Sequence, residues 1–184
     1  MALALPNLIL KTDRKIKALS GLETEIDHLR FPEPECLNHK IVLTTGVFDL
    51  VHLGHIDYFE KAKSYGDILV VSIVDDKFVR KGPGRPIFSQ ELRLKWLAAL
   101  EVVDFVVLNG DFGPWKIMKA IKPDVYVKGQ PDKINWTWGF KKDFETMHEL
   151  GGRTVLIKEI MHSTEIFMSL RDISRREKTI KKTP

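Results

Sequence analysis

The chain has 184 residues, of which 43% are hydrophobic and 29% charged, and its Lys and Arg residues outnumber its Asp and Glu residues by four. This balance is typical of a water-soluble globular domain, which we expect to be cytoplasmic and to have no membrane partner. The sequence holds no apolar run of the roughly 20 residues that span a bilayer, and its single cysteine excludes an internal disulfide and a multi-cysteine zinc site.

The first 39 residues are predicted to form a helical appendage and a linker. Between residues 8 and 30, apolar side chains recur near the spacing of a helix and are mixed with charged ones. Pro32 and Pro34 then stop any helix, because proline lacks the amide donor and restricts the residue before it. We expect residues 1–39 to pack on the core of the molecule or on a partner subunit.

From Lys40 onwards, the sequence alternates between short apolar runs and amphipathic segments. Continuously apolar runs are typical of strands that are buried on both faces of a parallel sheet. The pattern therefore predicts an α/β domain over residues 40–170, in which helices cover a doubly wound, parallel, five-stranded sheet. The strands are expected at residues 41–45, 68–74, 102–108, 125–128 and 154–157, and the helices at 54–65, 89–100, 114–121, 140–150 and from about 164.

The loop after the first expected strand is where the sequence indicates chemistry, because ligands of such sheets bind beyond the carboxyl ends of the strands. It reads Thr-Thr-Gly-Val-Phe-Asp-Leu-Val-His-Leu-Gly-His over residues 44–55. His52 and His55 lie three positions apart at the start of a helix, beside its unpaired amides. Gly54 between them lets an anion approach the backbone closely. The combination predicts a polyphosphate site, with a two-ligand metal site or structural histidines as the alternatives.

This stretch resembles the signature of the cytidylyltransferase-like nucleotidyltransferases, which carry a His-x-Gly-His motif (HxGH). The resemblance implies a Rossmann-like fold and transfer of an AMP or CMP group from a nucleoside triphosphate to a sugar phosphate or alcohol phosphate, with release of pyrophosphate. Within the family, the sequence is most similar to the adenylyltransferase domain of ADP-heptose synthase and to glycerol-3-phosphate cytidylyltransferase. The likeness spans about residues 40–170 and continues at Asp75-Asp76, at Arg85-Pro86 with Glu91-Leu92-Arg93, and at residues 99–104, 119–129 and 162–166.

The resemblance also implies which residues form the site. It places His52, His55 and Lys81 in catalysis, with the histidines as donors to the transferring phosphate. Mg²⁺ is expected with ATP or CTP as the substrate, ATP being favoured, and a homodimer is expected; no metal-ligating residue is assigned. The implied nucleotide-binding residues are Thr45, Gly46, Val47, Phe48, Asp49, Gly54, Arg93, Lys128, Gly129, Ser163 and Thr164, and the implied substrate-binding residues are Asp75, Arg80 and Trp136.

Several of these assignments have structural alternatives. Asp49 could stabilise a turn instead of positioning the loop or a magnesium-bound nucleotide. Lys81 could belong to an ordinary solvated loop, and Arg93 could pair with a glutamate on the surface of its helix. Trp136 could pack its own loop or a dimer surface instead of lining a substrate pocket.

The last motif departs from the family pattern, in which Ser-Thr-Thr, a basic or polar residue and Ile open the final helix. Aligned on Ile166, this chain has His162 and Glu165 on either side of Ser163 and Thr164. The two hydroxyl groups suit a nucleotide at the start of a helix, whereas Glu165 adds negative charge where phosphate should bind. His162 and Glu165 thus leave open a nucleotide-binding module with lost or reduced catalysis. A second alternative is an accessory domain of a sugar-kinase assembly, because the resemblance includes proteins that work with a sugar kinase and residues 1–39 could dock there.

The basic C-terminal tail, residues 171–184, accounts for the positive charge of the chain. It contains six basic and two acidic residues, which is the whole excess. Such a tail can bind nucleic acid, but no aromatic residue lies among its charges. We expect a solvated tail and no nucleic-acid partner.

Overall fold

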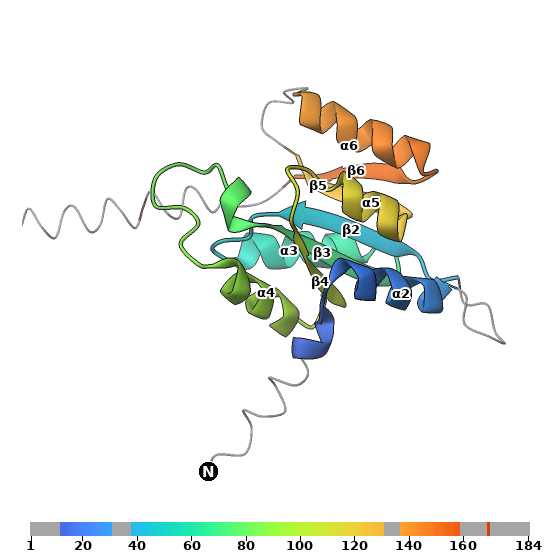
Figure 1. Ribbon diagram of the computed structural model, residues 1–184, viewed down its shortest axis with the longest axis horizontal. Coiled ribbons are helices and arrows are strands. Elements are labelled where there is room, and N and C mark those ends of the chain that lie inside the picture. The colour runs from blue at the N-terminus through green and yellow to red at the C-terminus, as the bar shows by residue number, and fades with distance from the viewer. Residues whose placement is uncertain (1–11, 31–37, 131–136, 159–168, 170–184) are drawn as a thin grey trace, which may run out of the picture.

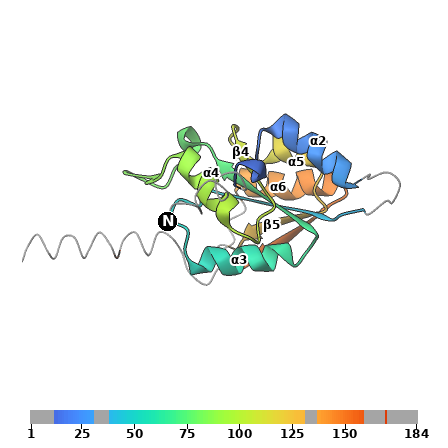
Figure 2. The same ribbon diagram turned by 90° about the horizontal axis from the view of Figure 1, so that it is seen from below.

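The computed structural model describes residues 12–30, 38–130, 137–158 and 169, and within them the chain forms one α/β unit (Figure 1). Its centre is a parallel sheet with helices on both faces (Figure 2). The predicted fold class is confirmed, but the sheet has six strands and not five. The sixth strand comes from the N-terminal segment, where the sequence predicted helix.

The strands are joined in the spatial order β1-β4-β3-β2-β5-β6, and every neighbouring pair is parallel. The order reverses between β2 and β5, which places the crevice of a doubly wound sheet at their carboxyl ends. The first and fourth strands expected from the sequence are therefore neighbours. The bounds are β1 (Ile16–Lys17), β2 (Ile41–Gly46), β3 (Ile68–Val74), β4 (Phe105–Asn109), β5 (Val125–Gly129) and β6 (Arg153–Ile157).

The strand β4 begins three residues later than the sequence pattern predicts. The amide of Val103 donates to the carbonyl of Leu100, which forms a turn, and the amide of Asp104 donates to the carbonyl of Leu69. Val103 is nevertheless fully buried. The predicted strand was too long at its start, because the turn before β4 is buried and apolar and so continues the apolar run of the strand.

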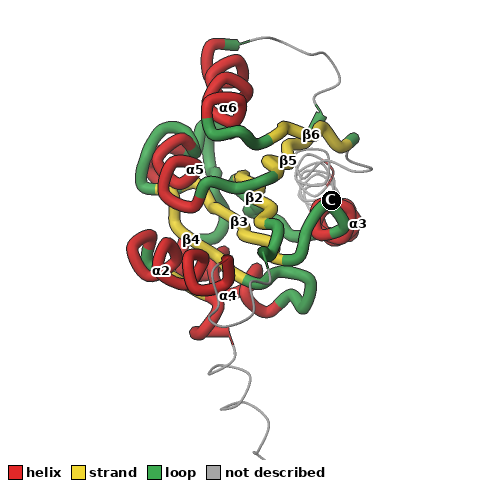
Figure 3. Tube along the Cα trace, turned by 90° about the vertical axis from the view of Figure 1, so that its right-hand side faces the viewer, coloured by secondary structure: helices red, strands yellow, loops and turns green. Residues whose placement is uncertain are grey.

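Two apolar layers hold the helices to the sheet. The view almost along the strands shows the helices on either side of the sheet (Figure 3). The helices α3 and α4 pack on one face, through Phe59 and Leu97 among others. The helices α2, α5 and α6 pack on the other face. Their bounds are α2 (Leu19–Arg30), α3 (Leu53–Lys63), α4 (Gln90–Ala99), α5 (Trp115–Ile121) and α6 (Trp138–Glu149), and the 3₁₀ turn η1 covers Asp76–Phe78.

The N-terminal segment is part of the core over residues 12–30. The strand β1 pairs with β4 at the edge of the sheet, and Leu22 and Ile26 of α2 are buried against α5. The Lys15 ammonium donates to the carbonyl oxygens of Leu100 and Val103 at 2.9 and 2.6 Å. Residues 16–17 are extended because they pair with β4. The helix that ends at Arg30 therefore begins at Leu19, later than the sequence pattern from residue 8 predicts.

The helix expected from about residue 164 and the tail 171–184 lie outside the described residues, apart from residue 169. Among the residues that the structure describes, every helix is too short or too polar to cross a bilayer.

Candidate functional site

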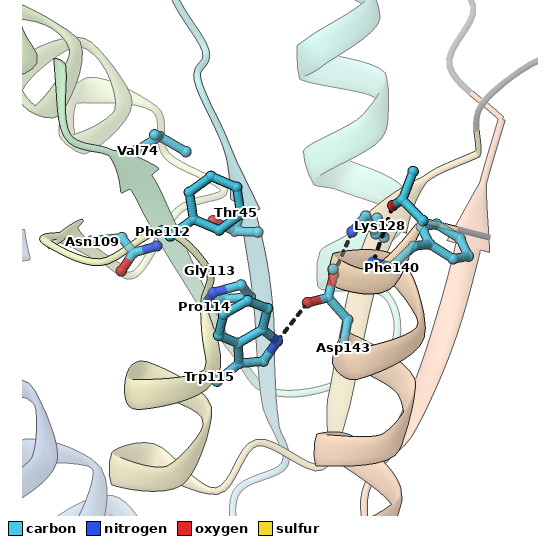
Figure 4. A pocket seen from close by; sticks show the side chains of 12 residues that line it. Thr45, Val74, Asn109, Phe112, Gly113, Pro114, Trp115, Lys128, Phe140 and Asp143 are labelled. Atoms are coloured by element: carbon cyan, nitrogen blue, oxygen red, sulfur yellow. Dashed lines mark hydrogen bonds and ion pairs between the residues drawn. The ribbon is translucent and has the colours of Figure 1, made fainter. Parts of the chain in front are cut away.

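A cavity of about 230 Å³ opens at the carboxyl edge of the sheet (Figure 4). Four neighbouring strands, β4, β3, β2 and β5, contribute one residue each from at or near their carboxyl ends. Side chains alternate between the faces of a strand, and these four point towards the face that α5 and α6 cover. They are Asn109, Val74, Thr45 and Lys128.

Aromatic side chains form the walls of the cavity. Trp115 comes from the start of α5, Phe140 from the first turn of α6, and Phe112 from the loop before α5. Gly113 leaves room for the Trp115 indole, because a Cβ atom at residue 113 would lie 2.5 Å from the ring. The loop between β4 and α5 therefore requires a residue without a side chain so that the indole can reach the cavity.

The carboxylate of Asp143 lies between two walls of the cavity (Figure 4). It accepts a hydrogen bond from Trp115 Nε1 at 2.9 Å and forms an ion pair with Lys128. Burial raises the pKa of Asp143, and the Lys128 ammonium and the Trp115 donor offset only part of that rise. Burial also raises the pKa of the nearby Tyr126 phenol, as does the Asp143 charge. The floor of the cavity is thus a paired but poorly solvated carboxylate.

Thr45 connects this cavity with the predicted nucleotide loop. Its neighbour Thr44 faces α3, where its hydroxyl shares a 2.6 Å hydrogen bond with Tyr58, which in turn donates to the carbonyl of Val127. Alternation along β2 therefore turns Thr45 towards the cavity that it lines. Its buried Oγ1 has no hydrogen-bond partner among the described residues. An unsatisfied buried hydroxyl at a cavity wall is suited to a polar ligand.

The two histidines stand on the other side of the end of β2, at the start of α3. Their ring centroids are 3.9 Å apart with the planes 27° from parallel, and His55 is 6% exposed. The Phe48 ring meets His55 edge-on and packs against Gly46, where a Cβ atom would approach it to 2.7 Å. The N-cap residue of α3 is His52, and its side chain makes no capping hydrogen bond to the helix. The first amides of α3 therefore point into the space beyond the sheet.

Asp49 has no exposed surface and is used within the protein. It accepts hydrogen bonds from the amides of Ile87 and Phe88 at 2.8 to 3.0 Å and pairs with the Arg85 guanidinium, which is 2% exposed. Burial alone would raise the pKa of Asp49, but the two amides and the guanidinium outweigh burial and lower it. The structure thus places Asp49 as a stabiliser of the loop that precedes α4, in agreement with the alternative for this residue.

Arg93 is also fully buried, although a ligand contact or a surface ion pair was expected. Its guanidinium donates to the carbonyl oxygens of Val47, Val74 and Phe88 and pairs with Asp76. The alternative of a pairing with a glutamate on the helix surface does not hold, because the side chain turns inwards from α4. Arg93 thereby joins the ends of β2 and β3 to the start of α4.

The basic loop between η1 and α4 projects beyond the carboxyl edge (Figure 1). Arg80 and Lys81 are exposed there, and Gly82 and Gly84 adopt φ values of +93° and +76° that favour glycine. Asp75, an expected substrate-binding residue, accepts a hydrogen bond from the amide of Lys77 and caps η1. This amide, followed by the Lys77 ammonium, lowers the pKa of Asp75.

The remaining expected residues divide into backbone positions and undescribed ones. Val47 follows the end of β2, Gly129 is the last residue of β5, and Gly54 is buried in the first turn of α3. The Phe48 side chain is in the core, so a nucleotide could meet only its backbone. Trp136, Ser163 and Thr164, with His162 and Glu165, lie outside the described residues.

The sequence reasoning missed the walls of the cavity. Neither Trp115 nor Asp143 was selected, and Asn109, which is 2% exposed, was not named although it follows an expected strand. The available signal was a polar residue at a strand end for Asn109. For Asp143 it was a carboxylate flanked by Phe140 and Met147 on the buried face of a helix.

Residues 43–166 match the family model described as cytidylyltransferase-like. The bifunctional protein HldE of Desulfatibacillum aliphaticivorans is 38% identical over 162 residues, which cover 86% of this chain and 31% of that protein. HldE of Wolinella succinogenes is 50% identical over 92 residues, covering 49% of this chain and 19% of that protein. The chain therefore spans about a third or less of the length of these curated relatives.

Two solved structures are also similar. The lipopolysaccharide core biosynthesis protein from Thermoplasma volcanium is 30% identical with a TM-score of 0.55, and the match covers 68% of this chain and 99% of that one. Pantoate-beta-alanine ligase from Francisella tularensis has a TM-score of 0.54 at 14% identity, covering 80% of this chain and 68% of that one, and shares the fold alone.

Proposed function

The chain belongs to the cytidylyltransferase-like family, and on that basis we propose that it transfers a nucleotidyl group from a nucleoside triphosphate to a sugar phosphate or alcohol phosphate. The expected membership is thereby confirmed. The observation that carries the proposal is the arrangement around the end of β2. Two stacked histidines and the uncapped start of α3 lie on one side, and a cavity with a carboxylate floor lies on the other.

The proposed reaction is a displacement at the α-phosphorus of the triphosphate. An oxygen of the acceptor phosphate forms a new bond to this phosphorus, and the bond to the bridging oxygen breaks. The bridging oxygen keeps the electron pair and leaves as part of pyrophosphate. The acceptor phosphate supplies the attacking oxygen and the triphosphate supplies the leaving group. The protein therefore has to align the two substrates and stabilise charge, and it needs no nucleophile of its own.

In this proposal His52 and His55 donate hydrogen bonds to the phosphate oxygens on which charge builds up. The start of α3 adds its amides and the positive end of the helix dipole. Arg80 and Lys81 on the exposed loop are placed to approach the triphosphate from beyond the edge of the sheet. Gly54 keeps the first turn of α3 open to the phosphates.

The rigid frame comes from the residues that turn inwards. Arg93 joins the ends of β2 and β3 to α4, and Asp49 fixes the segment 85–88 behind the basic loop. We assign both residues a positioning role instead of direct contact with the nucleotide. The backbone of Gly46, Val47 and Gly129, together with Ser163 and Thr164, completes the proposed nucleotide site.

Magnesium enters this proposal as part of the substrate. Among the described residues, no three His, Cys, Asp or Glu side chains come together as a metal site. Mg²⁺ commonly takes most of its ligands from triphosphate oxygens and water and few from the protein. The MgATP or MgCTP complex is therefore the proposed form of the nucleotide, ATP being favoured.

The acceptor is proposed to occupy the cavity, with its phosphate near the Thr45 hydroxyl and its body against the side chains of Trp115 and Asp143, which are hydrogen-bonded to each other. The solved relative from Thermoplasma volcanium is described as a lipopolysaccharide core biosynthesis protein, which supports an acceptor of the sugar phosphate class. A homodimer and a cytoplasmic location are part of the proposal.

The test is a matrix of assays with pyrophosphate as the measured product. The chain is incubated with Mg²⁺, each of the four nucleoside triphosphates, and a panel of sugar phosphates and alcohol phosphates. The proposal expects pyrophosphate release that requires both substrates and is lost in the His52→Ala, His55→Ala double variant. Absence of release in every combination, or undiminished release by the double variant, would refute it.

A further inference from the structure

We propose that Asp143 and Trp115 determine which acceptor this protein takes, by selecting a phosphate ester with a compact, neutral, hydroxyl-rich ring over a short alcohol phosphate. The inference rests on the proposed function, because it identifies the cavity beside β2 as the acceptor side of the site. It adds the recognition of the acceptor body, which is separate from the chemistry at the histidines.

The first argument is the hydrogen-bonding capacity of the cavity floor. A carboxylate has about four acceptor positions; the contacts to Trp115 and Lys128 use two of them, and the nearby Tyr126 hydroxyl is a third donor. The Asp143 side chain is 3% exposed and lines the cavity, so bulk water can satisfy the rest only poorly. A hydroxyl group both donates and accepts, so a ligand hydroxyl can donate to Asp143 and accept from Lys128.

The second argument is charge. Asp143 and Lys128 neutralise each other, so the floor offers no net positive charge to a second anionic group. A carboxylate or phosphate placed there would face the Asp143 oxygens at short range. Neutral hydroxyls avoid this repulsion and keep the ion pair intact. The floor therefore favours an acceptor whose only strong negative charge is the phosphate at the Thr45 end.

The third argument is the shape of the walls. The Trp115 and Trp138 rings meet edge to face at 5.2 Å, and the Lys142 ammonium lies 4.4 Å and 4.8 Å from their centres. These contacts fix the indole of Trp115 at the cavity, opposite Phe140. Rigid aromatic faces suit the C–H face of a ring and gain little from a flexible three-carbon chain.

The fourth argument is size. The cavity of about 230 Å³ lies below the roughly 300–1,000 Å³ that is common for drug-sized ligands. It suits a single ring and excludes an oligosaccharide from the same space. Phe112 lies at the rim of the cavity and is 61% exposed, and Trp138 lies beside its Trp115 wall and is 64% exposed. Part of a larger acceptor could extend over these two rings.

The experiment measures binding to the full chain by titration calorimetry. The probes are a panel of hexose and heptose phosphates, glycerol 3-phosphate, inorganic phosphate and a non-hydrolysable nucleoside triphosphate analogue. Asp143→Asn keeps the shape and removes the charge, whereas Glu145→Gln makes the same change at an exposed position of α6 and serves as the matched control. Trp115→Phe keeps a ring and removes the donor to Asp143.

We expect at least one sugar phosphate to bind ten times or more tightly than glycerol 3-phosphate. Asp143→Asn should raise its Kd about tenfold, as for loss of hydrogen bonds to a charged group, and leave inorganic phosphate and the nucleotide analogue unchanged. Trp115→Phe should raise the same Kd by about threefold, which decides the matter if Asp143→Asn does not fold. Glu145→Gln should bind as the parent chain does.

Three results would overturn the inference: glycerol 3-phosphate binding as tightly as every sugar phosphate, no sugar phosphate binding at all, or equal weakening of all probes in the folded variants. A parallel assay of pyrophosphate release distinguishes failure of this inference from failure of the proposed function. Selective binding that depends on Asp143 without any pyrophosphate release retains this inference and refutes the transfer. Transfer to glycerol 3-phosphate alone retains the transfer and refutes this inference.

Discussion

Two buried carboxylates near the same edge of the sheet illustrate two uses of an acid. Asp49, on the side of α3 and α4, is fully enclosed and receives two amides and one guanidinium from residues 85–88. Asp143, on the side of α5 and α6, receives one indole and one ammonium group and borders a cavity. The pKa of Asp49 is lowered and that of Asp143 is raised, although burial acts to raise the pKa of both.

The difference is in the number and kind of donors that the chain itself provides. Backbone amides cannot move away from Asp49 without unfolding the loop, so its charge is permanently satisfied. Asp143 depends on side chains alone and retains hydrogen-bonding capacity towards the cavity. We infer that the first region stabilises the frame of the site and that the second recognises a ligand.

The largest expected effect is on stability, at Asp49. Asp49→Ala removes the partner of a buried guanidinium and of two amides, which should lower the free energy of unfolding by about 3–5 kcal/mol. Asp57→Ala, which removes a surface ion pair with Lys61 in α3, is the control and should cost less than about 1 kcal/mol. Urea denaturation of both variants measures this; comparable losses would erase the distinction between the two carboxylates.

The next effect is on catalysis, at the histidines. His55→Ala or His52→Ala should reduce kcat about a hundredfold or more, because each removes a donor to charge that develops in the transition state. Binding of the acceptor to the cavity should change little, since these residues lie on the α3 side. His148→Ala at an exposed position is the control. Near-parental turnover by the double variant would exclude the histidines from the reaction.

Two glycines test the same contrast with smaller changes. Gly46→Ala would press on the Phe48 ring within the core, so we expect a loss of about 1–3 kcal/mol in unfolding free energy. Gly113→Ala would displace the half-buried Trp115 indole, so we expect weaker binding of the acceptor with a smaller loss of stability. Gly21→Ala has open space around it and is the control. The reverse pattern would show that the cavity wall, and not the histidine loop, holds the fold together.

The smallest effect is in the pH dependence of stability. Because the folded-state pKa of Asp49 is below its ordinary value of 3.8, its stabilisation is present above that value and disappears as the pH falls through the folded pKa. The folded-state pKa of Asp143 is above 3.8, so its contribution is fully present below 3.8 and is lost as the pH rises through the folded pKa.

The stability difference between the parent chain and Asp143→Asn should therefore shift in favour of the parent between pH 7 and pH 3. The difference between the parent and Asp49→Asn should shift against the parent over the acid end of that range. Thermal unfolding of the three proteins at matched ionic strength measures both slopes. Slopes of the same sign would show that the two carboxylates have similar surroundings.

The sequence alone determined the layered architecture and indicated the place of the proposed reaction. Buried parallel strands require continuous apolar runs, so the strands from residue 41 onwards could be predicted within a few residues. The histidines, Gly54 and the helix that begins at Leu53 are neighbours along the chain, so their proximity needed no knowledge of the fold. The family resemblance depended on the same local continuity.

Tertiary structure alone decided the partners. Trp115, Lys128 and Asp143 come from three separate elements, and their meeting depends on β5 lying next to β2 and on which face each side chain points to. The edge strand β1 formed because β4 offered an unpaired edge, against the helical pattern of its own segment. A local pattern specifies whether a side chain is buried, but the hydrogen bonds of a buried polar group come from residues distant in sequence. For that reason Asp49 and Arg93 could be located from the sequence as single residues and Asp143 was missed, while the role of all three depended on the assembled sheet.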